Sequence, residues 1–199
     1  MKIVSVLGSP RYDGNSTTIA NRFIETAASL GADIQTFQLN RLTYRGCQGC
    51  CTCKTKIDVC TLKDDLTEVL EAIKESDVVM LSTPVYIGDI PGQVKSFIDR
   101  TYSYLKPNYI SEPTPSRIPS GKQALLILTQ GAPEGRMRDV RDRYERHMRF
   151  AWAMEEVHVI RATGVGRLGI PKDVPDHYLL QAEEMAGIIM TKWSDGRKT

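Results

Sequence analysis

The residues from Ser9 to Thr17 are of the types that bind a phosphate group. They follow an apolar run at residues 3–7 and precede a helical pattern whose apolar positions are Ile19, Phe23, Ala27 and Leu30. The stretch combines glycines, hydroxyl groups, an asparagine and an arginine with the free N–H groups of a helix start. No Gly-Lys-Ser/Thr sequence closes it, so it is not a P-loop. An ordinary turn capped by Asn15 or Ser16 uses the same residue types, but the crowding of donors favours a phosphate site.

The second stretch that could do chemistry is a cysteine-rich segment at residues 45–62. All five cysteines of the chain lie in it, and an odd number at close spacing argues for metal or redox chemistry rather than a disulfide framework. The pattern Cys47-x2-Cys50-x2-Cys53-x6-Cys60 offers four thiolates to one centre, with Cys51 as an extra. Bacterial ferredoxins use a similar C-x2-C-x2-C run to hold a [4Fe–4S] cluster. Four thiolates also suit structural zinc.

Length, composition and charge are those of an ordinary globular protein. The 199 residues suffice for one domain with a sizeable core, which we expect to span residues 1–199. With 41% hydrophobic residues, 25% charged residues and a formal net charge of +2, nothing demands nucleic acid or a membrane as partner. A strand begins almost at residue 1, which leaves no room for a signal peptide, and no apolar run approaches the ~18 residues of a membrane span. We therefore expect a cytoplasmic protein.

Strand and helix patterns alternate five times along the chain. The expected strands lie at residues 3–7, 33–39, 77–82, 124–128 and 157–160. After a helix that starts at Asp64–Asp65, three more carry apolar faces: Val94, Phe97, Ile98 and Leu105; Met137, Val140, Tyr144 and Met148; and Tyr178, Ala182, Met185, Ile189 and Trp193. The proline-rich residues 106–121 form a long loop. This alternation predicts one α/β domain with a parallel sheet and right-handed crossovers.

Three donor-rich turns follow the expected strands, at residues 9–17, 83–88 and 129–135. In an open parallel sheet, ligands bind beyond the carboxyl ends of the strands. The turns after the first, third and fourth strands converge on that edge. Together they predict a ligand site more strongly than any one of them does.

These turns resemble those of the flavodoxin-like NADPH-dependent FMN reductase superfamily. The resemblance rests on Ser9-Pro10-Arg11 with Gly14-Asn15-Ser16, and on Pro84-Val85-Tyr86 followed by Lys95-Ser96-Phe97-Ile98-Asp99-Arg100, and it extends to about residue 135. It implies a flavodoxin-like three-layer sandwich whose five-stranded parallel sheet has the strand order 2-1-3-4-5. FMN would then bind at the switch between the first and third strands.

The resemblance also implies which residues bind FMN. Those around the phosphate would be Ser9, Arg11, Asn15, Ser16 and Thr17. Those along the flavin ring, with backbone amides near N5 and the pyrimidine edge, would be Pro84, Val85, Tyr86, Ile87 and Gly88. The other side of the ring would be covered by Thr129, Gln130 and Gly131, which match by position more than by sequence. A flavin enzyme of this kind needs no catalytic acid or base, because the protein supplies binding, orientation and potential.

Within this frame, the cysteine segment resembles that of the iron-sulfur flavoproteins. These pair FMN with a [4Fe–4S] cluster and often assemble as dimers or tetramers. The resemblance implies that Cys47, Cys50, Cys53 and Cys60 hold the cluster and that it exchanges electrons with FMN, within a homodimer or homotetramer. Whether Cys50 or its neighbour Cys51 faces the cluster stays open.

Two other functions remain compatible with the sequence. The first is a cluster-free reductase that uses NAD(P)H to reduce FMN, a quinone or a similar acceptor through a bound flavin. The second is a flavin- or zinc-binding module that senses or scaffolds without turnover. The sequence does not identify the electron donor or acceptor, small molecule or protein, nor does it choose between NADH and NADPH.

Two further patterns are given less weight. The G-x-G-x-x-G match at residues 164–169 lacks a helix opening within the turn, so a glycine-rich loop is the better interpretation. The arginines of residues 136–149 alternate with Asp139, Asp142 and Glu145, which is typical of a solvated helix face rather than a nucleic-acid patch. A contact from these arginines to a nicotinamide cofactor's phosphate is a weaker alternative.

Overall fold

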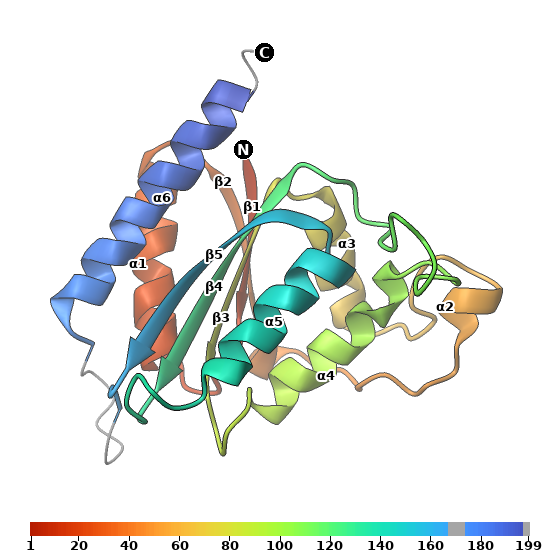
Figure 1. Cartoon of the computed structure of the whole chain (residues 1–199), viewed down its shortest axis with the longest axis horizontal. Helices are drawn as coiled ribbons and strands as arrows, with labels where there is room; N and C mark the ends of the chain where they lie inside the picture. Colours follow the sequence, from red (N-terminus) through yellow and green to blue (C-terminus); the bar gives the residue numbers. More distant parts are fainter. Residues whose placement is uncertain (167–173, 197–199) are drawn as a thin grey trace.

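A five-stranded parallel β-sheet forms the middle layer of the protein, as seen in a computed structural model that describes residues 1–166 and 174–196 (Figure 1). The strands are β1 (Lys2–Leu7), β2 (Asp33–Gln38), β3 (Val78–Pro84), β4 (Lys122–Gln130) and β5 (Met154–Thr163). Their order is β2-β1-β3-β4-β5, and every neighbouring pair is parallel. The predicted flavodoxin-like fold and strand order are confirmed.

Helices cover both faces of this sheet. They are α1 (Asn15–Ser29), α2 (Thr52–Thr55), α3 (Leu66–Glu75), α4 (Gly92–Arg100), α5 (Arg138–Ala151) and α6 (Asp176–Gly196), with 3-10 turns η1 (Leu39–Arg41) and η2 (Thr101–Tyr104). Helices α1 and α6 lie on one face of the sheet, and α3, α4 and α5 lie on the other (Figure 1). Helix α2 lies at the outer end of the layer formed by α3, α4 and α5. Across the described ranges, no helix is both long and apolar enough to cross a membrane.

Each face of the sheet has its own apolar core. Successive strand residues point to opposite faces, so Val4 and Val6 of β1 pack with α3, α4 and α5, whereas Ile3 and Leu7 pack with α1 and α6. Strand β3 is buried along its whole length because both faces are covered. Each fully buried valine, leucine, isoleucine or methionine side chain of these cores contributes about 1.5–3 kcal/mol to the stability of the fold. This double-sided packing holds the carboxyl ends of β1, β3 and β4 in fixed positions.

Three side chains predicted on helix faces lie outside the helices. Leu30 follows α1 and is 50% exposed, because the chain turns at Gly31, where φ is +90°. Leu105 is buried, but it follows η2 rather than continuing α4. Met137 precedes α5 in the left-handed conformation, with φ +60°. In each case the apolar spacing continues past a backbone turn, which periodicity alone does not detect.

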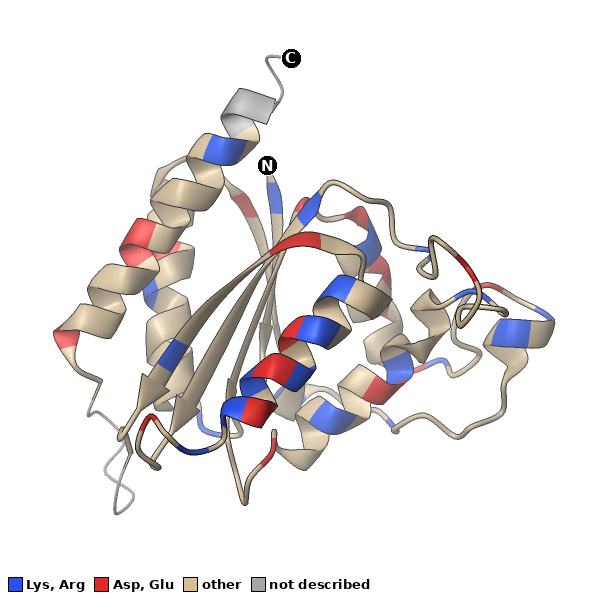
Figure 2. Ribbon diagram, in the orientation of Figure 1, with Lys and Arg blue, Asp and Glu red and all other residues tan. Residues whose placement is uncertain are grey.

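The charged face of α5 is laced with ion pairs along the helix. Blue and red residues alternate on α5 in Figure 2. Arg143 pairs with Asp139 at 2.8 Å, and both Arg141 and Arg149 pair with Glu145, at 3.4 and 3.1 Å. These are i,i+4 pairs in which each arginine side chain is about half exposed. The prediction of a solvated face is confirmed.

The proline-rich loop at residues 106–121 folds against the cysteine segment. It pairs with the chain before it through a bridge between Leu105 and Ser116. Arg117 of the loop donates hydrogen bonds to the carbonyl oxygens of Ser103 and Leu105, to that of Cys53 at 3.2 Å, and to Asp58 Oδ1 at 2.9 Å. The loop therefore has a structural role, which is to fasten the cysteine segment to the end of η2.

Candidate functional site

The first turn of the site, residues 8–17, depends on two glycines. A Cβ on Gly8 would lie 2.4 Å from Val94 Cγ2 and 3.0 Å from the carbonyl oxygen of Ser82. A Cβ on Gly14 would lie 2.6 Å from Ser9 Oγ. Only glycine allows this close approach of backbone to neighbouring groups. The loop consequently curls tightly between the end of β1 and the start of α1.

Two buried hydroxyl groups at the start of α1 have no hydrogen-bond partner in the described part of the protein. Ser16 is 1% exposed and Thr17 is 4% exposed, and neither hydroxyl has a hydrogen-bond partner within residues 1–166 and 174–196. The residue that caps α1 is Gly14, so the alternative of a turn capped by the side chain of Asn15 or Ser16 is wrong. A buried unpaired hydroxyl costs about 1–3 kcal/mol. An anion at the positive end of α1 would supply the missing acceptor.

The second turn begins where β3 ends, at Pro84. The amide of Val85 donates to the carbonyl oxygen of Thr129 at 2.8 Å, and the amide of Tyr86 donates to that of Asp89 at 2.7 Å. Ile87 has φ +49° and a fully exposed side chain, and Gly88 has φ +81°. In the described part of the chain the amides of Ile87 and Gly88 donate no hydrogen bond. Of the amides in this turn, these two are the ones that could serve a bound ligand.

The third turn is fastened by side chains of β4 and β5. Strand β4 extends to Gln130, so Thr129 and Gln130 end the strand rather than belonging to the loop. Gln130 Nε2 donates to three loop carbonyl oxygens, at 3.1 to 3.2 Å, and its Oε1 accepts from Arg161 Nε at 3.3 Å. The side chain of Gln130 therefore holds the loop in shape.

One cavity of about 200 Å³ brings the three turns together. It is lined by Ser9, Arg11, Gly14, Asn15, Ser16, Pro84, Val85, Tyr86, Thr129, Gln130, Gly131, Val165 and Gly166. Most of the predicted flavin-binding residues are thus neighbours, although the lining does not include Thr17, Ile87 or Gly88. The cavity lies between the carboxyl ends of β1, β3 and β4, where strand order reverses.

Sequence reasoning missed Val165 and Gly166, which follow β5 and line the same cavity. Gly166 has φ +76°, and a Cβ there would lie 3.0 Å from Asn15 Nδ2. The signal was present in the glycine-rich stretch that begins at residue 164. That stretch follows a fifth parallel strand, so it reaches the same edge of the sheet. The last glycine of the pattern, Gly169, lies outside the described residues.

The five cysteines line a second, smaller pocket at the outer end of the α3–α4–α5 layer. Cys53 is buried, Cys60 is half-buried, and Cys47, Cys50 and Cys51 are exposed; all five are free thiols. Over the described residues, no three cysteine, histidine or acidic side chains are close enough to hold a metal ion. The structure brings the predicted ligands to one pocket without assembling them around a centre.

Hydrogen-bond donors surround the sulfur atoms. Gly49 N lies 3.5 Å from Cys47 Sγ, and hydrogen bonds from Thr52 lower the pKa of the Cys50 thiol. Burial raises the pKa of the Cys53 thiol, and the neighbouring ammonium of Lys54 opposes that rise. Lys54 Nζ also donates to the carbonyl oxygens of Tyr102 and Leu105, at 2.6 and 2.7 Å. The hydrogen bonds from Thr52 therefore favour the thiolate of Cys50, whereas Lys54 only partly offsets the effect of burial on Cys53.

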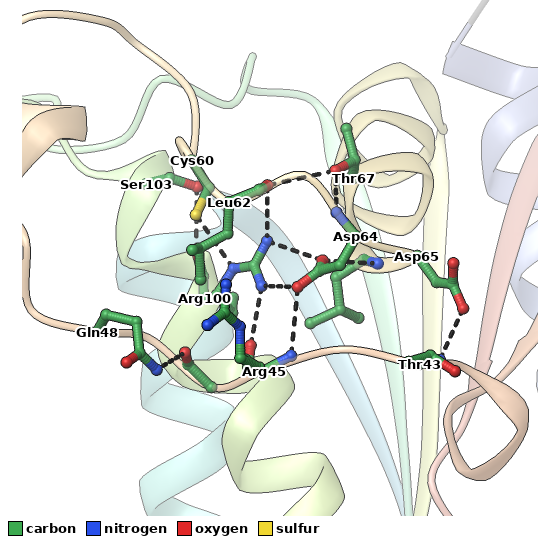
Figure 3. A network of polar contacts seen from close by, with 12 residues as sticks. Thr43, Arg45, Gln48, Cys60, Leu62, Asp64, Asp65, Thr67, Arg100 and Ser103 are labelled. Carbon is green, nitrogen blue, oxygen red and sulfur yellow. Dashed lines mark hydrogen bonds and ion pairs between the residues drawn. The ribbon is translucent and has the colours of Figure 1, made fainter.

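Arg100, the last residue of α4, holds both ends of the cysteine segment (Figure 3). Its side chain is fully buried and forms a two-pronged ion pair with Asp64, at 2.7 and 3.1 Å. It also donates to the carbonyl oxygens of Arg45 and Leu62, at 2.8 and 3.2 Å, and through Nε to Cys60 Sγ at 3.1 Å. Burial alone would lower the pKa of Arg100, but Asp64 and Cys60 outweigh it and keep the guanidinium charged.

Helix α4 joins the two candidate sites. At its start, Gln93 Nε2 donates to the carbonyl oxygen of Gly8 in the first turn, at 3.1 Å. At its end lies Arg100 with its bond to Cys60. The nine residues of α4 span about 13 Å at 1.5 Å per residue. The cavity and the cysteine pocket are therefore held at opposite ends of one short helix.

A groove of about 720 Å³ between α4 and α5 contains a half-buried histidine, His147. Its Nε2 lies 3.1 Å from Thr101 Oγ1, which itself donates to the carbonyl oxygen of Ile98. Nε2 must therefore carry the hydrogen that Thr101 Oγ1 accepts. Burial, assisted by the charge of Lys95, lowers the pKa of His147 to about 4.

This burial predicts a pH effect on stability. His147 is protonated near pH 6.5 in the unfolded chain but only near pH 4 in the folded protein. The free energy of unfolding is therefore unaffected by this group above pH 6.5, and it decreases as the pH falls from 6.5 to 4. The loss should be roughly 2–3 kcal/mol. His147→Gln keeps a donor for Thr101 and does not titrate. Urea unfolding between pH 4 and 7 should show a flatter profile for the variant, and identical profiles would contradict the assignment.

The geometry defines a class of protein, and comparison with known proteins defines the family. A flavodoxin-like sheet with a cavity and the start of a helix at its switch point is the architecture of nucleotide- and flavin-binding proteins. The sequence profile of the family described as NADPH-dependent FMN reductase matches residues 1–160. The chain belongs to this family of FMN-dependent oxidoreductases.

Individual relatives fall into two groups. An iron-sulfur flavoprotein of Archaeoglobus fulgidus is 35% identical over 104 residues, which are 52% of this chain and 47% of the relative. An FMN-dependent NADH:quinone oxidoreductase of Bordetella parapertussis is 30% identical over 109 residues, 54% of this chain and 51% of the relative. The chain thus matches about half the length of these relatives. The solved NAD(P)H:quinone oxidoreductase of Methanothermobacter marburgensis shares the fold, with a TM-score of 0.69, 18% identity, and 94% of this chain and 95% of that one covered.

Proposed function

We propose that this protein is an FMN-dependent redox protein in which a [4Fe–4S] cluster, held by Cys47, Cys50, Cys53 and Cys60, exchanges electrons with FMN. The observation that carries the proposal is the pairing of two sites by α4. One is a cavity with unpaired buried hydroxyls at a helix start, and the other is a pocket lined by all five cysteines. The likeness to the A. fulgidus iron-sulfur flavoprotein supports the cluster assignment.

The residues of the cavity fit FMN. Its phosphate would accept hydrogen bonds from Ser9, Ser16 and Thr17, with the charge of Arg11 nearby. Pro84–Gly88 and Thr129–Gly131 would lie on the two sides of the ring, and the free amides of Ile87 and Gly88 would orient it. When bound, FMN supplies electron transfer in single or paired steps, and the protein's part is to bind, orient and shield the ring.

The residue types of the cysteine pocket suit an anionic cluster, which would have to draw the thiols together on binding. Four of the thiols have the spacing of a cluster motif, and Lys54 and Arg100 provide cationic N–H donors to Cys53 and Cys60. Cys51 has φ +53°, and its thiol donates a hydrogen bond to the carbonyl oxygen of Gly49 at 3.5 Å. A thiol that donates this bond is protonated, whereas a cluster ligand must be a thiolate. We therefore assign Cys50 rather than Cys51 as the ligand. When bound, the cluster would add one-electron transfer beside the flavin.

The absorption spectrum of freshly purified, anaerobic protein tests the proposal. We expect the flavin bands together with a broad additional absorbance, and iron and sulfide in equal proportion. Cys53→Ala should abolish the additional absorbance and leave FMN bound, whereas Cys51→Ala, the matched control, should leave both. A flavin spectrum without iron in the wild-type protein would refute the cluster. Loss of FMN from Cys53→Ala would refute the separation of the two sites.

The second candidate function is a cluster-free, NAD(P)H-dependent quinone reductase. The likeness to the B. parapertussis NADH:quinone oxidoreductase favours it. In this case the thiols would have no metal, and NADH or NADPH would bleach the flavin in a protein free of iron. Under either candidate, we propose that the chain is one FMN-binding domain with a cysteine-rich insertion at residues 45–62, and that it forms a homodimer or homotetramer.

A further inference from the structure

The contacts of Arg100 exceed what is needed to end a helix. Its guanidinium forms five hydrogen bonds, to one sulfur, two carbonyl oxygens and both oxygens of one carboxylate (Figure 3). All of these acceptors belong to residues 45–64: Arg45 precedes the cysteine pattern, Cys60 ends it, and Leu62 and Asp64 follow it. Two further cations that contact this segment, Lys54 and Arg117, bind mainly carbonyl oxygens.

We propose that Arg100 is the positioning residue of the cluster: it holds Cys60 in place for ligation and raises the cluster's reduction potential through its N–H···S bond to Cys60. This inference rests on the proposed function, because it requires the cluster.

The physical argument starts from the charge that reduction adds. A cluster that accepts an electron becomes more negative, so a hydrogen bond to a ligating sulfur stabilises the reduced form more than the oxidised form. Arg100 Nε lies 3.1 Å from Cys60 Sγ, and the side chain is fully buried, so water screens the interaction little. Such supporting contacts commonly change metal affinity or activity by 10–100-fold.

Asp64 makes this arrangement rigid. It grips the outer nitrogens of the guanidinium, which leaves Nε directed at Cys60 (Figure 3). Its oxygens also accept from the amides of Arg45 and Leu66, each at 3.2 Å, so the carboxylate is itself fixed at the start of α3. The chain beyond Cys60 thus reaches a defined position before any cluster is bound.

The test compares three variants with the wild-type protein after anaerobic reconstitution with iron and sulfide. Arg100→Lys keeps the charge but loses the Nε donor. Arg100→Met with Asp64→Asn removes both charges together, so that no buried charge is left unpaired and the protein should fold. Lys95→Met removes an exposed cation from the same helix and is the control. The readouts are iron, sulfide and FMN content, and the midpoint potentials of cluster and flavin.

The double variant should show a tenfold lower ratio of reduced to oxidised cluster at a fixed solution potential, which is about 59 mV for one electron. Arg100→Lys should fall between it and the wild type, Lys95→Met should match the wild type, and the flavin potential should be unchanged throughout. A double variant that retains FMN but loses its iron also supports the role of Arg100. If the wild-type protein has a cluster and all variants share its potential, this inference alone is wrong; if the wild type has no cluster, the proposed function fails and the inference with it.

Discussion

Asp64→Ala should lower the free energy of unfolding by about 3–5 kcal/mol, because it leaves the buried guanidinium of Arg100 without its counter-charge. Asp64 is the only acidic partner of Arg100 in the described structure, and the Arg100 side chain is 0% exposed. The variant also removes the acceptor for the amide of Leu66 at the start of α3. Urea unfolding of the apo protein near pH 7 should show a lower midpoint with an unchanged slope.

The matched control is Asp99→Ala on α4. Asp99 pairs with Lys95 at 2.5 Å, but both side chains are about half exposed, so this loss should be only about 0.3–0.5 kcal/mol. Equal losses in the two variants would contradict the distinction between the buried and the exposed pair.

The Asp64 effect should also depend on pH. Burial by itself would raise the pKa of Asp64, but hydrogen bonds from Arg100 and Arg45 reverse the shift and keep it below its ordinary value. The contribution of Asp64 is therefore complete above the pKa of the unfolded state, about 3.9, and is lost as the pH falls through the lower folded value. The wild type and Asp64→Ala should converge in stability only in strong acid.

The double variant Ser16→Ala, Thr17→Val should bind FMN at least a hundredfold more weakly than the wild type. Hydrogen bonds to a charged group contribute about 1.5–3 kcal/mol each, so two of them account for roughly 3–6 kcal/mol. The apo form of the variant should be as stable as the wild type or more so, since two buried hydroxyls without partners are removed. Titration of the apo protein with FMN, followed by flavin fluorescence, measures the affinity, and urea unfolding measures the stability.

Ser5→Ala is the control for this variant. Ser5 of β1 is also fully buried and its hydroxyl also lacks a partner in the described structure, but it lies outside the first turn. Its replacement should leave FMN affinity unchanged while giving a similar gain in apo stability. If Ser5→Ala lowered the affinity for FMN as much as the double variant does, the hydroxyls at the start of α1 would not be phosphate ligands.

Much of the fold was predictable because its signals are local. The uninterrupted apolar runs of β3 and β4 indicate strands covered on both faces, and alternation with helices then requires a parallel sheet with right-handed crossovers. The residues at which the helices begin and end were harder to predict from the sequence. Leu105 lies just after η2 with an extended backbone, and Met137 lies just before α5 in the left-handed conformation, so both positions depend on backbone dihedral angles that residue type does not reveal.

The candidate site divides in the same way. The hydroxyls and glycines of the first turn are adjacent in sequence, so their grouping was visible without a structure. Val165 and Gly166 were missed because their turn is incomplete as a dinucleotide motif, and only the place of β5 in the sheet brings them to Asn15. Gln130 lines the cavity, and its predicted place beside the flavin stays a prediction. That its side chain binds loop carbonyl groups depends on Arg161 and the loop's curvature.

The sequence by itself determined the order of elements, the edge of the sheet where a ligand would bind, and the presence of a thiol-rich segment, since all three follow from periodicity and short spacing. The tertiary structure added the relations between distant residues. Arg100 lies 36 residues from Asp64 and 55 from Arg45, and no local pattern brings them together. Only the packing of α4 against the sheet carries one of its ends to the first turn and the other to Cys60. A side chain's partners across such separations are set by the backbone's path through space, which spacing along the chain does not encode.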